Sequence, residues 1–141
     1  MPSPLLPKMN RFVQFINSAD ETIGKEVVSD AAIFHVPFQE APLKGFSGYM
    51  QVLGMMRSAF SDVQWTLEDT VAEDDRVVAK FTLRGTHDGE FFGVPPSGNK
   101  IEARAMNIYR FVDGKIVEET GLPDLFAIMG QIGALKPPGA Q

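Results

Sequence analysis

The chain has 141 residues, no cysteine, a formal net charge of -5 and a sequence pI of about 5.0. Its length suits one domain with one hydrophobic core, and 44% hydrophobic with 22% charged residues is ordinary for a soluble globular protein. The acidic balance argues against nucleic acid or an anionic membrane surface as the main partner. The lack of cysteine excludes a disulfide framework, a thiolate nucleophile and a cysteine metal site.

The chain ends show no targeting pattern. The stretch from Met1 to Pro7 lacks the charged and apolar regions of a signal peptide. No apolar run approaches the ~20 residues that cross a bilayer. We therefore expect no membrane association and, by default, a cytoplasmic protein. We expect residues 1–141 to form a single domain, with about 1–6 and 134–141 loosely held.

The first part of the chain predicts two helices. Apolar side chains in residues 8–17 fall on one helical face, and Pro7 suits the first turn. Ser18 precedes Glu21 by three residues, which is a capping-box pattern. A second helix is therefore predicted to begin there and to run to about Val28.

The middle of the chain predicts one short strand and the longest helix. Residues 31–38 (AAIFHVPF) are apolar and are interrupted by Pro37, as in a short strand. Residues 44–62 carry apolar side chains at helical spacing from Phe46 to Phe60.

The pattern then changes to a period of two, which predicts strands over 63–71, 76–85, 100–112 and 115–121. Asp113-Gly114 predicts a tight turn between the last two strands. Residues 123–133 predict a final helix that starts at Pro123 and is capped by Gly133.

Helices and hairpin-linked strands that are segregated along the chain indicate the α+β class. A twisted antiparallel or mixed sheet cannot wrap fully around a few helices. We expect it to curl over them and leave an open-ended apolar cavity, which is a usual place for a small-molecule site.

Several stretches resemble the SnoaL-like polyketide cyclase (ester cyclase) family: FTLRGTHDGEFFGVPPSGNKI, YRFVDGKIVEE and PDLFAIMGQIG, with FHVP and AFSDVQW upstream. The resemblance covers about His35 to Gly133 and is specific as a combination. That family belongs to the cone-shaped α+β superfamily of ketosteroid isomerase, scytalone dehydratase and limonene epoxide hydrolase. The resemblance implies a cone-shaped domain, a cofactor-free and metal-free aldol cyclisation of a polyketide ester by an acidic residue, and a homodimer built on sheet faces.

The sequence departs from the family pattern at three places. Thr120 stands where the family usually has a tryptophan, which would line the mouth of the cavity. Ser61 replaces the proline of a Phe-Pro-Asp stretch, and the PPSGNK segment carries an additional Asn99. The missing tryptophan bears on the size and shape of the substrate.

The resemblance implies that Asp124, just before the last helix, is the acid/base. The residues alone favour another interpretation, a carboxylate that stabilises the start of a helix. A helix N-terminus lowers the pKa of a carboxylate, whereas burial raises it. For Asp124 to act as a base on a carbon acid, the effect of burial on its pKa must be at least as large as that of the helix N-terminus.

Four other residues are candidates for substrate binding. His35, on a short apolar strand, either packs in the core or donates to an enolate or keto oxygen. Arg110 forms a surface ion pair or faces inward to fix the Asp124 carboxylate or a substrate carbonyl. Tyr49 belongs to the apolar helical stripe, and its hydroxyl is expected to reach the cavity.

The fourth candidate, His87, lies in the stretch GTHDGEFFGVPPSGNK. The glycines and prolines of this stretch predict a packed hairpin connection. His87 is expected to bond to backbone there and to lie at the rim of the cavity.

The remaining motifs exclude other chemistry. The two histidines, His35 and His87, show no metal-ligand spacing. There is no dinucleotide or phosphate loop and no serine nucleophile elbow, so no metal and no cofactor is expected. Three hypotheses remain: an acid/base enzyme acting on a small hydrophobic carbonyl substrate, a binding protein that uses the same cavity without turnover, and a sheet that serves as a protein-interaction module.

Overall fold

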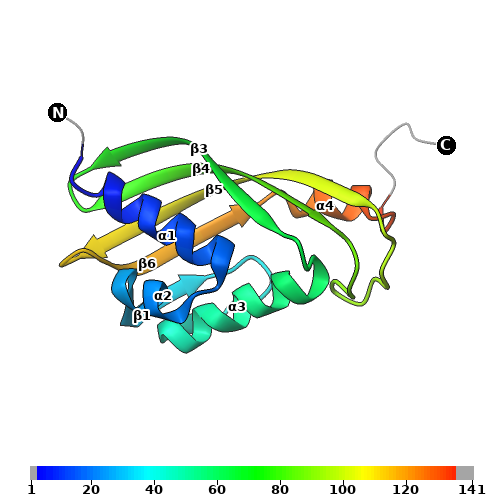
Figure 1. Cartoon of the computed structure of the whole chain (residues 1–141), viewed down its shortest axis with the longest axis horizontal. Coiled ribbons are helices and arrows are strands. Elements are labelled where there is room, and N and C mark those ends of the chain that lie inside the picture. The colour runs from blue at the N-terminus through cyan, green and yellow to red at the C-terminus, as the bar shows by residue number, and fades with distance from the viewer. Residues whose placement is uncertain (1–2, 136–141) are drawn as a thin grey trace.

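The computed structural model describes residues 3–135. A mixed sheet in the order β2-β1-β6-β5-β4-β3 curves along the helices α1 and α3 (Figure 1), which confirms the predicted α+β class. The elements, in chain order, are α1 (Leu6–Ser18), α2 (Glu21–Val27), β1 (Val28–His35), β2 (Leu43–Lys44), α3 (Gly45–Ala59), β3 (Gln64–Glu73), β4 (Arg76–Thr86), β5 (Lys100–Val112), β6 (Lys115–Pro123) and α4 (Leu125–Gln131).

The cap of α2 differs from the predicted one. Asp20, not Ser18, caps this helix, because its carboxylate accepts from the backbone N–H of Thr22 at 2.9 Å and of Ile23 at 3.4 Å. Ser18 is the last residue of α1, and its hydroxyl donates to the Gln14 carbonyl at 2.7 Å. A carboxylate that reaches two orphan donors is the stronger cap.

Each long strand has an inner face toward the helices and an outer face toward solvent. β4 and β5 are antiparallel neighbours, and their buried and exposed side chains alternate as the sequence predicts. The inner face carries the apolar side chains of β4 and β5: Val77, Ala79, Phe81, Leu83, Ile101, Ala103, Ala105, Tyr109 and Phe111.

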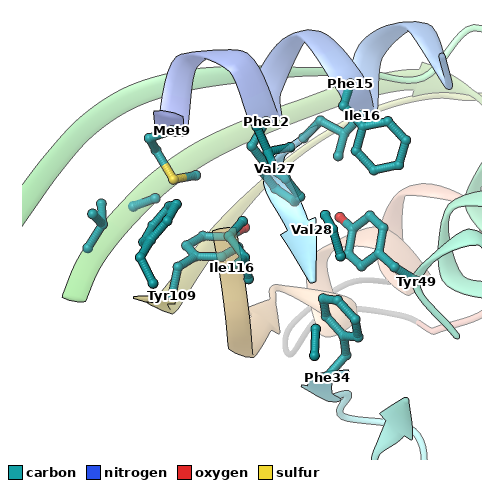
Figure 2. Packing of buried hydrophobic residues seen from close by; sticks show 14 of the residues in the cluster. Met9, Phe12, Phe15, Ile16, Val27, Val28, Phe34, Tyr49, Tyr109 and Ile116 are labelled. Atoms are coloured by element: carbon teal, nitrogen blue, oxygen red, sulfur yellow. The ribbon is translucent and has the colours of Figure 1, made fainter. Parts of the chain in front are cut away.

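The core has two clusters. The larger one joins α1 and α3 to the inner face of the sheet, and Figure 2 shows Phe12 of α1 directed toward Tyr109 of β5. The ring centroids of Phe12 and Tyr109 are 5.3 Å apart in an edge-to-face arrangement. The smaller cluster lies near α4 and includes Phe60, Phe91 and Ile128.

The last strand is longer than predicted and the last helix is shorter. Pro123 ends β6, where it lies opposite Ala105, instead of starting the helix. Asp124 is the N-cap of α4, and Gly133 follows the helix with a φ of 86°. Pro123 is the last residue of β6, beyond the positions that pair with β1, so its missing N–H costs the sheet little.

The chain ends lie mostly outside the described residues. Of the segments predicted to be loose, 1–2 and 136–141 are outside, whereas Leu6 already belongs to α1. Among residues 3–135 no helix has both the length and the apolar character that crossing a membrane requires.

Candidate active site

An apolar cavity of about 110 Å³ lies between the sheet and α3. It draws its walls from both core clusters, so it lies where they meet. The walls come from the β1–β2 connection, α3, the inner sheet face and the β4–β5 connection: Phe34, His35, Val36, Pro37, Phe38, Tyr49, Val52, Met55, Met56, Trp65, Leu83, Phe91, Phe92, Ala105, Asn107, Glu119, Gly121, Pro123 and Leu125.

Glu119 is the one acidic side chain among the residues that line the described cavity. It projects from β6, and its side chain is buried, with 8% of the residue exposed. Burial raises the pKa of this carboxyl from an ordinary 4.5 to about 7, against an opposing contribution from the Tyr109 hydroxyl, which hydrogen-bonds to it. A carboxyl with a pKa near 7 populates both its acid and its base form at neutral pH.

Asn107 orients the groups around this carboxyl. The backbone N–H of Leu122 donates to Asn107 Oδ1 at 3.1 Å, which fixes the direction of the amide. Asn107 Nδ2 then donates to the Tyr109 hydroxyl at 3.0 Å and lies 3.4 Å from Glu119 Oε2. Because the Tyr109 oxygen accepts from Asn107, its own hydrogen is left to point at Glu119.

The Tyr49 hydroxyl is the second polar group of the cavity. Tyr49 is held by α3 between Phe12, Phe15 and Phe34, with ring centroids 4.8 to 5.9 Å away (Figure 2). Burial, with the charge of Glu119, raises the pKa of Tyr49 well above 10, so it remains a neutral donor. Within residues 3–135 its hydroxyl has no hydrogen-bond partner that would compete with a ligand. Tyr49 is among the residues that line the cavity, and its predicted role in substrate binding stays a prediction.

Asp124 lies outside the cavity. Its carboxylate accepts from the backbone N–H of Ala127 at 2.9 Å, and it borders a polar surface depression together with Arg104 and Thr82. The neighbours Pro123 and Leu125 do line the cavity. The geometry is that of the helix-start carboxylate that the residues alone favoured. The predicted acid/base role of Asp124 stays a prediction.

His35 and Arg110 meet on the outer face. His35 Nε2 is 2.9 Å from Glu118 Oε2, and Arg110 Nε is 3.5 Å from Glu118 Oε1. The His35 hydrogen bond, and then Arg110, lower the pKa of Glu118. Although His35 borders the cavity, its imidazole ring is engaged by Glu118. The structure does not bring Arg110 to Asp124 or to the cavity.

Thr120 also belongs to the outer face. It is exposed on β6, opposite Ile108 and beside His35. The family resemblance places the side chain at position 120 at the mouth of the cavity. In this chain that side chain lies on the outer face of the sheet, away from the cavity. The reason is that Glu119 takes the inward direction, and neighbouring strand residues point to opposite faces.

His87 is held in the scaffold and is absent from the cavity wall. It is fully buried against Phe60, and its Nδ1 accepts from the backbone N–H of Ser97 at 3.1 Å. The adjacent Asp88 carboxylate bonds to the backbone N–H and hydroxyl of Ser61. The stretch is thus the packed connection that its glycines and prolines predict, and it ends at the cavity through Phe91 and Phe92.

Sequence reasoning missed Glu119 and Asn107. Strict alternation along β6 from the buried Ile116 would place Glu118 inside and Glu119 outside. The pairing of β5 with β6 shifts by one residue between Arg110 and Phe111, so this alternation is reversed. Asn107 shares the inner face with Tyr109, and a polar residue within this otherwise apolar face was the available signal.

In residues 3–135 no group of three or more metal-ligating side chains is close enough together to hold a metal ion. The cavity offers the carboxyl of Glu119, the amide of Asn107 and the phenol of Tyr49 in mostly apolar surroundings. These groups can move a proton and hold an oxygen that gains negative charge.

Comparison with known proteins gives a consistent result. The family described as SnoaL-like polyketide cyclase matches residues 8–132. The aklanonic acid methyl ester cyclase DnrD of Streptomyces peucetius is 30% identical over 119 residues, covering 83% of this chain and 79% of that protein. The nogalonic acid methyl ester cyclase of Streptomyces nogalater is 28% identical, covering 83% and 84%.

Solved structures agree in fold. IdmH from Streptomyces antibioticus superposes with a TM-score of 0.84 at 28% identity, covering 93% of this chain and 99% of that one. TsrD from Streptomyces laurentii gives a TM-score of 0.84 at 25% identity, covering 96% and 99%.

Proposed function

The chain belongs to the SnoaL-like polyketide cyclase family, and from this we propose that it closes a carbon ring in a polyketide-type ester by general acid–base chemistry, with Glu119 as the acid and base. One observation carries the assignment of the residue. Glu119 is the buried carboxyl in the apolar cavity, and its pKa is raised to about 7. A carboxylate with that pKa is a stronger base than an exposed one.

The reaction needs two proton transfers. The Glu119 carboxylate removes a proton from a carbon between two carbonyls, and the resulting enolate carbon attacks a ketone carbon of the same molecule. A carbon–carbon bond forms, and the ketone oxygen becomes an alkoxide. Protonated Glu119 returns the proton to that alkoxide, so substrate and product are isomers. Tyr49 donates a hydrogen bond to the oxygen that becomes negative.

Asn107 and Tyr109 keep the carboxyl in place during both transfers. Their hydrogen bonds run from the strand backbone through the amide and phenol to Glu119. A base fixed in this way loses little entropy when it meets the substrate.

The walls suggest the class of substrate. They are almost entirely apolar, with the polar groups gathered at Glu119, Asn107 and Tyr49. Such a site fits a small hydrophobic carbonyl compound with one activated carbon. The two cyclases named above act on methyl esters, and a methyl ester of a β-keto acid has the required proton between two carbonyls.

The proposed function is tested by proton exchange. Methyl benzoylacetate in deuterated water is expected to exchange its α-proton faster with the wild-type protein than with buffer, as followed by NMR. The catalysed rate is expected to rise with pH through about 7, since only the ionised carboxyl removes the proton. Binding of the ester without any catalysed exchange would contradict the proposal and indicate a binding protein.

We further propose that the protein forms a homodimer through the outer face of the sheet. Apolar side chains stand exposed there at neighbouring ladder positions, and Met106 and Leu122, which lie opposite each other, are 51% and 63% exposed. A contiguous apolar area of this kind marks an interaction surface. A two-fold axis would bring the same residues of two copies together. The members are Val71, Val78, Met106, Ile108 and Leu122.

The dimer is tested by a charge on that face. Met106→Lys is expected to give a monomer by light scattering at micromolar concentration where the wild type gives a dimer, because dimerisation would bury the added charge. Phe126→Lys is the matched control, because Phe126 is similarly exposed but belongs to α4. A wild-type monomer, or a Met106→Lys dimer, would contradict the interface.

A further inference from the structure

The proposed ring closure places negative charge on more than one oxygen. Loss of the α-proton leaves an enolate whose charge is shared by the two carbonyl oxygens beside that carbon. Attack on the ketone then moves the charge to a third oxygen, the alkoxide. The Tyr49 hydroxyl carries one hydrogen and donates to one oxygen at a time. A second donor in the cavity would stabilise an oxygen that Tyr49 does not reach.

Apart from the carboxyl, four side chains of the cavity wall carry an N–H or O–H group: His35, Tyr49, Trp65 and Asn107. Two of these groups are already engaged. His35 Nε2 is hydrogen-bonded to Glu118, and the Asn107 amide donates within the network around the buried carboxyl. The indole N–H of Trp65 is therefore the remaining candidate for a donor beside Tyr49.

The fold does not use the indole N–H of Trp65. Within residues 3–135 this N–H donates to no oxygen, and its nitrogen is not among the side-chain atoms that are buried without a partner. Trp65 is half-buried, so the N–H is open to water or to a ligand. A phenylalanine would supply a similar apolar wall without a polar group that lacks a partner in the protein. The N–H thus indicates a role in binding.

Asn17 of α1 fixes the position of Trp65. β3 is an edge strand, so one side of its backbone has no neighbouring strand. Asn17 Oδ1 accepts from the Trp65 backbone N–H at 2.8 Å, and Asn17 Nδ2 donates to the Trp65 carbonyl at 2.9 Å. Trp65 pairs with Leu83 of β4, and both side chains line the cavity. The amide thus replaces a neighbouring strand at this one residue and holds the indole in the wall.

We propose that the Trp65 indole N–H binds a negatively charged carbonyl oxygen of the substrate, as a second donor beside Tyr49, with Asn17 as the residue that positions it. The ligand that such a donor pair selects is a flat, conjugated oxyanion, which is the chemical form of an enolate. The inference rests on the proposed function in taking the cavity as the place where the enolate forms. It concerns the charge on oxygen, and the proton transfer stays with Glu119.

Two one-ring probes of similar shape test the donor without turnover. 4-Nitrophenolate carries a delocalised negative oxygen, as an enolate does, whereas nitrobenzene has the same ring and no net charge. Equilibrium dialysis at alkaline pH, read by absorbance, gives the affinity for each probe. The parent for this test is the Glu119→Gln protein, because an ionised Glu119 would repel the phenolate. The ratio of the two affinities is the quantity compared between variants.

Trp65→Phe, added to this parent, is the decisive variant. It keeps an aromatic ring in the wall and removes the donor, so the melting temperature is expected to change little. Affinity for 4-nitrophenolate is expected to fall ~10- to 100-fold, the usual contribution of a hydrogen bond to a charged group. Affinity for nitrobenzene is expected to change less than about twofold, because that probe has no negative oxygen for the donor.

Catalysis gives a second readout when Trp65→Phe is made in the wild-type protein. The kcat for α-proton exchange of methyl benzoylacetate is expected to fall ~10- to 100-fold, while KM changes less than about threefold. The donor acts mainly on the charged enolate, which resembles the transition state, and less on the neutral ester. A residue that served only packing would change the melting temperature and KM instead.

Asn17→Ala tests the positioning role. It leaves the indole in the chain but removes both bonds to the Trp65 backbone, so the ratio of phenolate to nitrobenzene affinity is expected to fall. Trp65 is the single tryptophan, and its fluorescence anisotropy is expected to fall as well. Gln64→Ala is the matched control, because Gln64 precedes Trp65 on β3 and its amide donates to the Asn17 carbonyl. This control is expected to keep the ratio.

The inference is overturned if the Glu119→Gln protein does not bind 4-nitrophenolate, if Trp65→Phe leaves the affinity ratio or kcat unchanged, or if both probes weaken equally. An Asn17→Ala protein that keeps the ratio overturns the positioning role. Absence of catalysed exchange in the wild type would count against the proposed function, whereas the phenolate comparison needs no proton transfer and still decides the role of Trp65.

Discussion

Glu119→Gln is expected to lower the α-proton exchange and ring-closure rates by ~10²–10⁴, the usual contribution of a positioned acid/base. The amide keeps the size of the side chain and can still accept from Tyr109, but it cannot take the proton. Ligand binding, read from Trp65 fluorescence, is expected to change little. The result is checked by NMR exchange of methyl benzoylacetate under saturating ester.

Asp124→Asn and Glu118→Gln are the matched controls for this loss. Asparagine retains the cap of α4 through a side-chain oxygen on the Ala127 N–H, and Glu118 lies on the outer face. Both variants are expected to keep exchange within a few-fold of the wild type. A large loss in Asp124→Asn with full activity in Glu119→Gln would return the acid/base role to Asp124, as the family resemblance implies.

The second large effect is expected in the pH dependence of stability. Glu119 has a folded-state pKa of about 7 against an ordinary 4.5, so between these values the unfolded chain releases a proton that the folded protein retains. The stabilisation is complete below about pH 4.5 and is lost as pH rises through about 7. The difference between the folded and unfolded pKa values of Glu119 corresponds to roughly 3 kcal/mol of unfolding free energy.

Glu119→Gln removes this titration. Urea unfolding at both pH values gives the difference in unfolding free energy between the variant and the wild type. This difference is expected to shift by roughly 3 kcal/mol in favour of the variant from pH 4.5 to pH 8. Glu118→Gln is a control of opposite sign, because the hydrogen bond from His35 lowers the pKa of Glu118. That variant loses a stabilisation present above the ordinary pKa and lost in acid. An equal Glu119→Gln effect at both pH values would contradict a raised pKa.

Sequence pattern determined the class of the fold and most of its elements. The strands of 76–85 and 100–112 were evident because one face is buried and the other wet, which imposes a period of two on the side chains. The long helix around Tyr49 was evident for the equivalent reason at a period of 3.6.

Only the tertiary structure decided which carboxyl lies in the cavity. The family resemblance implied Asp124, whereas the structure leaves that side chain at a helix start and places Glu119 inside. The direction of Glu119 depends on a one-residue shift in the pairing of β5 with β6 between Arg110 and Phe111. Such a shift exchanges the two faces of a strand for every residue beyond it. It arises from how two strands pair, so the residues of either strand alone do not reveal it.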